Sequence, residues 1–116
     1  MAPRSKTQNQ NQMPAAEVVR PSDLVQYQPG AVVSRTLIQR PTGTVTLFAF
    51  DAGQGLSEHT AAFDALVQVI EGEGEFTIAG KPFALHAHEA ILWPAHQPHA
   101  VAASSRFKML LLMIRA

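Results

Sequence analysis

The sequence predicts an all-β domain, and three observations lead to that class. Segments rich in β-branched and aromatic residues recur along the chain, and Gly- and Pro-based turn signals separate them about every 8 to 12 residues. No long stretch has helical periodicity. The 116 residues are enough for one domain with its own core. Many short strands favour a sandwich or barrel, and jelly-roll closure handles the edges of so many strands.

Each strand is bounded by recognisable turn chemistry. The first follows Pro29-Gly30, the second follows the break at Pro41-Thr42-Gly43, and a glycine loop at Ala52–Gly55 comes next. A short strand is expected to end at Glu71-Gly72-Glu73-Gly74, and Ala79-Gly80-Lys81 is typical of a hairpin. The expected strands are Ala31–Arg40, Thr44–Asp51, Ala65–Ile70, Glu75–Ile78, Pro82–Leu85, Ala90–Trp93, His99–Ala103 and Phe107–Ile114.

The first sixteen residues differ from the rest. They include the polar tract SKTQNQNQ, which cannot bury enough surface to offset the entropy of ordering. We therefore expect residues 1–16 to be a disordered N-terminal arm and residues 17–116 to form the domain. The alternative is an arm that becomes ordered on a partner subunit.

Composition and charge exclude several functions. Nine Lys and Arg balance nine Asp and Glu, so no charge excess points to nucleic acid or an anionic membrane as a partner. The absence of Cys excludes disulfides, Cys-ligated zinc, iron–sulfur clusters and thiol catalysis. The sequence contains no apolar stretch of about 18 residues, so no membrane span is predicted. With no secretory signal pattern, a cytoplasmic location is expected.

The five histidines are the residues best suited to chemistry near neutral pH. His86 and His88 could clasp a metal from one face of an extended segment, but solvated turn histidines are the stronger expectation there. His59 and His99 each open a strand-like run just after a tight loop. Side chains at strand starts near the mouth of a barrel are well placed to bind a ligand. A single buried histidine is otherwise more often a hydrogen-bonded core residue.

The run from Gly53 to Ala103 resembles a small single-domain cupin, in motifs that cover about half the chain. Five residues separate Gly53 from His59, and Gly72 stands where the first motif closes. Pro94 and His99 match the second motif. The resemblance implies an RmlC-like double-stranded β-helix, which is a conical jelly-roll barrel.

The chain departs from the metal-binding pattern of that family at two ligand positions. Metal-binding cupins hold their ion with three His and one Glu, and here Ala61 and Ala65 replace one His and the Glu. The resemblance therefore implies a reduced divalent-metal site on His59 and His99. Zinc, manganese, iron and nickel are not distinguished by the sequence. The candidates for a third ligand are Asp64, Gln68, Glu58 and His96.

Asp64 and Gln68 are the two candidates included in the expected metal site, and each also has an alternative role. Asp64 is adjacent to the missing Glu position and needs a bulge to face inward, or else it bonds the backbone near a strand start. Gln68 stands in an apolar strand, formally on the face opposite to that position. Two alternatives remain for it: an interior polar residue there can line a pocket, or the ladder can shift by one residue.

The final strand, FKMLLLMIRA, is apolar on both faces. One face can fill a barrel, and a second subunit would cover the other, which predicts a homodimer. The alternative is coverage by the chain's own residues 17–38.

Three functions are compatible with the sequence. The first is a module that binds a small molecule in the barrel beside the reduced metal site. The second is a metal-dependent oxygenase or isomerase acting on a small polar substrate. The third is a metal-free sugar epimerase, which is disfavoured because few basic residues are available to hold phosphates.

Overall fold

The computed structural model describes residues 12–115, which form β-strands, loops and one short 3₁₀ turn, η2 (Pro21–Asp23). The predicted all-β class is confirmed. The described residues contain no helix long and apolar enough to cross a membrane. The strands are β1 (Val32–Arg40), β2 (Gly43–Phe50), β3 (Gly55–His59), β4 (Ala65–Ile78), β5 (Lys81–His86), β6 (Ala90–Trp93), β7 (His99–Ala102) and β8 (Phe107–Ile114).

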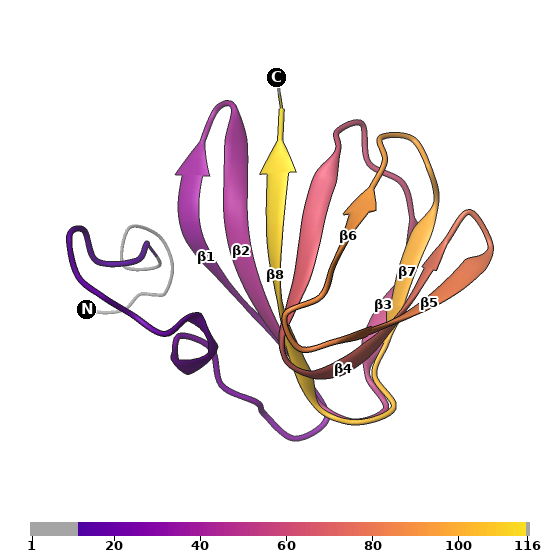
Figure 1. Cartoon of the computed structure of the whole chain (residues 1–116), viewed down its shortest axis with the longest axis horizontal. Coiled ribbons are helices and arrows are strands. Elements are labelled where there is room, and N and C mark those ends of the chain that lie inside the picture. The colour runs from indigo at the N-terminus through magenta and orange to yellow at the C-terminus, as the bar shows by residue number, and fades with distance from the viewer. Residues whose placement is uncertain (1–11, 116) are drawn as a thin grey trace.

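The strands form one curled antiparallel sheet in the order β1-β2-β8-β4-β7-β3, with β5 and β6 also pairing with β4. The long strand β4 joins the two halves of the curl (Figure 1). Its first part lies between β8 and β6, and its second part lies between β5 and β7. This arrangement agrees with the expected jelly-roll barrel, whose curl encloses an apolar core.

The inner face of the curl is filled by large apolar side chains. Phe50 and Phe107 lie opposite each other in the β2–β8 register, with stacked rings whose centroids are 4.6 Å apart. The Phe76 ring meets Phe107 edge-on at 5.9 Å. Each of these rings is at most 1% exposed. Burying one such ring contributes about 1.5–3 kcal/mol, so this cluster is a main source of stability.

A second apolar cluster lies outside the barrel. Leu37, Leu47 and Ala49 are buried there together with Val25, which comes from the segment before β1. Leu110 of β8 packs against the same cluster. The chain's own N-terminal segment therefore covers this part of the outer face, which is the alternative to coverage by a second subunit.

Part of the expected N-terminal arm can be located. Residues 1–11 lie outside the described residues. Within residues 12–16, the Met13 backbone N–H donates to the Leu37 carbonyl oxygen at 3.0 Å, and its side chain packs against the outer cluster. This short stretch therefore lies along β1.

Two expected strand boundaries are wrong. The segments expected at Ala65–Ile70 and Glu75–Ile78 are one strand: the register shifts between Val69 and Glu71, Gly72 follows with a φ of +78°, and the strand continues without a break. His59 ends a strand rather than opening one. Strand β3 already begins at Gly55, in the glycine loop. Because Gly55 has no Cβ, its backbone can lie close to the Val101 carbonyl oxygen of β7.

Candidate functional site

His59 and His99 face each other across two neighbouring strands. They are register partners in the β3–β7 pair, and their Nε2 atoms are 3.1 Å apart. Between Leu56 and His59, β3 contains one residue more than the facing part of β7. Leu56 lies opposite the core residue Val101, so strict alternation would have turned His59 outward. The bulge therefore brings the two imidazoles together.

The opposite nitrogen of each ring is held by the backbone. His59 Nδ1 lies 2.8 Å from the Ser57 carbonyl oxygen, and His99 Nδ1 lies 3.1 Å from the Gln97 carbonyl oxygen. A carbonyl oxygen only accepts, so each Nδ1 carries the hydrogen, and the Nε2 of a neutral ring presents a lone pair. Two lone pairs at this separation repel, so the contact holds either a hydrogen shared between the two Nε2 atoms or a cation bound by both.

The two rings have different environments. His99 is 3% exposed, whereas His59 is exposed. Burial is the largest cause that lowers the pKa of His99; the charge of His59 lowers it further, and the Gln97 carbonyl acts in the opposite direction. A lowered pKa keeps His99 neutral, which is the form that binds a metal ion.

The sequence reasoning missed Trp93 as a site residue. It ends β6 opposite Ala65, and its ring stacks on His99 with centroids 4.1 Å apart and an interplanar angle of 18°. It also meets His59 edge-on at 6.4 Å. A signal was present: Trp93 is the chain's one tryptophan and directly precedes Pro94 of the second motif.

Asp64 and Gln68 are both bonded to the backbone. Asp64 is exposed, and its Oδ1 accepts a hydrogen bond from the Ala95 N–H at 2.8 Å. Gln68 lies between the buried core residues Val67 and Val69, so its side chain faces away from the barrel interior. Its Nε2 donates to the His88 carbonyl oxygen at 3.3 Å.

The remaining candidates lie on exposed segments. Glu58 precedes His59 in β3, and His96 occupies a loop with a φ of +68°. Neither joins the histidine pair, because residues 12–115 contain no group of three or more His, Asp or Glu that could hold a metal ion. His86 instead lies near Glu73 and Glu89, at 3.5 and 3.3 Å.

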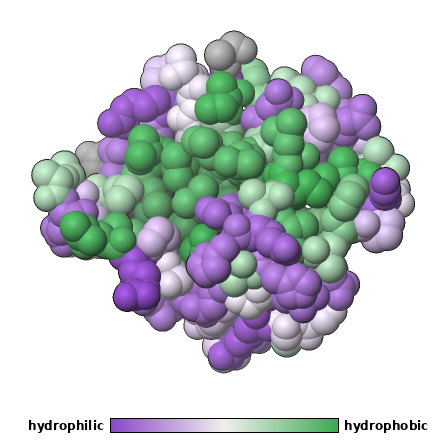
Figure 2. All heavy atoms as spheres, viewed as in Figure 1, coloured by the Kyte–Doolittle hydropathy of each residue, from purple (hydrophilic) through white to green (hydrophobic). Residues whose placement is uncertain are grey.

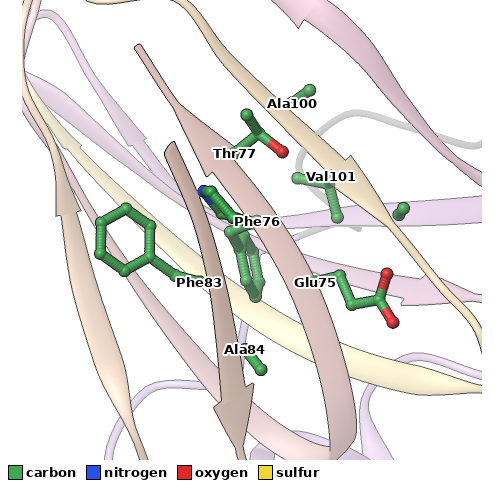
Figure 3. Close-up of a pocket in the computed structure, with 9 residues that line it drawn as sticks. Glu75, Phe76, Thr77, Phe83, Ala84, Ala100 and Val101 are labelled. Atoms are coloured by element: carbon green, nitrogen blue, oxygen red, sulfur yellow. The ribbon is translucent and has the colours of Figure 1, made fainter. Parts of the chain in front are cut away.

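A groove of about 360 Å³ lies elsewhere, along the adjacent strands β5, β4 and β7 (Figure 3). None of its lining residues is a predicted site residue. Glu75 accepts a hydrogen bond from the Ser104 hydroxyl at 2.5 Å. The groove is lined by Glu75, Phe76, Thr77, Pro82, Phe83, Ala84, Ala100, Val101 and Ala102.

Two comparisons with known proteins identify relatives. A conserved protein of unknown function from Streptococcus pyogenes is 32% identical, with a TM-score of 0.86 over 91% of this chain and 93% of that protein. A cupin superfamily protein from Desulfitobacterium hafniense is 27% identical, with a TM-score of 0.85 over 97% of this chain and all of that one (100%). No protein with a curated description matches.

Further matches include a larger protein and an enzyme. A cupin 2 conserved barrel domain protein from Leptotrichia buccalis is 41% identical over 80% of this chain, with a TM-score of 0.78, and this chain spans 45% of it. Salicylate 1,2-dioxygenase from Pseudaminobacter salicylatoxidans is 18% identical, with a TM-score of 0.68 over 75% of this chain and 27% of the enzyme. That likeness is one of fold. The model of the cupin domain matches residues 46–115, so the chain belongs to the cupin family.

Proposed function

We propose that this cupin binds a small molecule at the His59–His99 pair, where the two histidines hold a divalent transition-metal ion. The observation that carries this proposal is the pair of facing Nε2 atoms, each in a ring whose Nδ1 is fixed by a carbonyl oxygen. Hydrogen bonds of this kind orient the histidine ligands of metal sites and fix their tautomer.

The distances fit two ligands of one ion. Nitrogen ligands lie about 2.0–2.1 Å from a tetrahedral zinc ion and thus about 3.3 Å from each other, close to the 3.1 Å seen here. The other coordination positions fall to solvent or to the bound molecule, because the described residues bring no carboxylate to the pair. A bound ion supplies a Lewis acid for an oxygen atom of the ligand.

Elemental mass spectrometry tests the proposal directly. Untagged protein, purified without a nickel column, is incubated with Zn²⁺, Mn²⁺, Fe²⁺ or Ni²⁺ and dialysed. We expect about one ion per chain and loss of that ion in His59→Ala and His99→Ala. His86→Ala is the matched control, because His86 is exposed at the end of β5. Protein that takes up none of these ions, or an equal loss in the control, would contradict the proposal.

We also propose that the protein is a homodimer. An outward row of apolar residues crosses five neighbouring strands, with each residue opposite the next in the register. Apolar surface gathers where Figure 1 places these strands (Figure 2). Leu66 and Leu92 remain 42% and 52% exposed in this row. The row consists of Ile38, Val45, Leu112, Leu66 and Leu92.

A further inference from the structure

Trp93 forms one wall of the histidine site. Its side chain is only 3% exposed, and its ring covers the face of His99 at 4.1 Å. On the core side, the ring lies 6.3 Å from Phe76. The indole is therefore fixed between the apolar interior of the barrel and the imidazole pair.

The indole nitrogen of Trp93 is a buried donor with no acceptor among residues 12–115. An indole N–H can only donate, so rotation or a change of tautomer does not satisfy it. Native proteins rarely leave a buried donor unpaired, and such a group calls for an explanation in an absent ligand or water. The site thus lacks one hydrogen-bond acceptor.

The surroundings indicate which acceptor is missing. The pair supplies imidazole nitrogens, and no described carboxylate joins it to form a metal-binding group. The Trp93 ring packs against the rings of His59, Phe76 and His99 and belongs to the apolar core cluster. A negatively charged oxygen would satisfy the indole and balance a cation held by the histidines, and charge-assisted hydrogen bonds of this kind are the strong ones.

We propose that the Trp93 indole N–H donates to a carboxylate oxygen of a small organic acid bound beside His59 and His99. Trp93 then determines specificity, because it selects acids over amines of the same shape. This inference rests on the proposed function, since the ligand occupies the same site.

The single tryptophan permits a direct test. Indole-¹⁵N-labelled full-length protein gives one tryptophan side-chain cross-peak in a ¹H–¹⁵N correlation spectrum. Benzoate is the probe, and benzylammonium is its matched control with a similar ring and no acceptor. We expect benzoate to move the indole proton downfield in a saturable titration, and benzylammonium to leave it in place. Trp93→Phe, which keeps an aromatic ring, should weaken benzoate binding about tenfold or more.

Three outcomes would overturn the inference. In the first, benzoate does not bind. In the second, benzoate binds, but the indole proton stays in place and Trp93→Phe binds benzoate equally well. In the third, a buried water already accepts the indole hydrogen bond, so the indole proton is protected in the free protein and benzoate does not move it. Metal content separates these failures from failure of the proposed function. Trp93→Phe keeps both histidines and should still hold about one ion per chain.

Discussion

Asp51 connects three parts of the chain through its two carboxylate oxygens. Oδ1 accepts a hydrogen bond from Arg106 Nε at 2.8 Å, and Oδ2 accepts one from the Gly30 backbone N–H at 2.6 Å. The residue follows β2 directly, Gly30 belongs to the segment before β1, and Arg106 directly precedes β8. The bond to Arg106 is the largest cause that holds the pKa of Asp51 below its usual value, and the bond to Gly30 is the next.

This pKa shift predicts how stability depends on pH. A folded-state pKa below the unfolded value means that ionised Asp51 stabilises the fold above about pH 4 and that this contribution is lost as pH falls through the folded-state pKa. Asp51→Asn should therefore lower the melting temperature at pH 7, with a gap from wild type that narrows as the pH falls below about 4. Thermal unfolding followed by circular dichroism at each pH measures the gap.

The control for this experiment is Glu17→Gln, which alters an exposed carboxylate in the N-terminal segment. Its melting temperature should follow that of the wild type at every pH. A gap between Asp51→Asn and wild type that is independent of pH would show that the loss comes from packing rather than from the charge.

At the scale of the element, β4 depends on Gly72 to pass from one half of the barrel to the other. A Cβ built there would lie 2.5 Å from the Arg106 carbonyl oxygen and 3.0 Å from Phe107 Cβ. Gly53 provides a matched comparison, because its φ of +85° is also positive but nothing lies within 4 Å of its Cβ position.

The two glycines separate backbone strain from collision. Gly53→Ala should cost about 1–2 kcal/mol of unfolding free energy, which is the penalty of a side chain in the left-handed region. Gly72→Ala should cost about 2–5 kcal/mol, because displacement of β8 backbone adds to that penalty. Urea unfolding of both variants measures the difference. Equal losses would mean that β8 moves away from β4 freely.

The same element shows what the sequence could predict. The bounds of β6 and β8 were predicted correctly, because Pro94 stops one and both faces of the other are apolar. The break expected in β4 was wrong, since a glycine in the left-handed region can bend a strand as well as end it. Local sequence patterns therefore predicted where strands lie better than they predicted where a strand bends.

The site was predictable to a similar extent. Motif spacing selected His59 and His99 as candidates, and their side chains lie together in the structure. The stacking of Trp93 on His99, the bulge that turns His59 inward and the bond from Ala95 to Asp64 all depend on contacts between distant segments. Such contacts are set by strand register, which a linear pattern does not contain.

At the scale of the whole molecule, the outer face of the barrel is covered over only part of its area. The N-terminal segment packs against the cluster of Leu47 and Leu110, which Val45 of the apolar row also contacts, whereas Leu66 and Leu92 of that row stay exposed. Leu66 and Leu92 are direct cross-strand partners in that row, on β4 and β6. Adjacent exposed leucines of this kind indicate a contact surface, and a second copy of the chain offers the same row in return.

Sedimentation velocity at several protein concentrations tests the proposed dimer. Wild type should sediment as a dimer, and Leu66→Lys/Leu92→Lys should sediment as a monomer, because burying two ammonium groups opposite apolar side chains is strongly unfavourable. The melting temperature of the variant monomer should show that it remains folded, since both positions are already exposed within one chain. Ala84→Lys, at an exposed position on β5, should remain a dimer. A monomeric wild type, or a double variant that still dimerises, would contradict an interface at this row and leave the barrel site to function within a single chain.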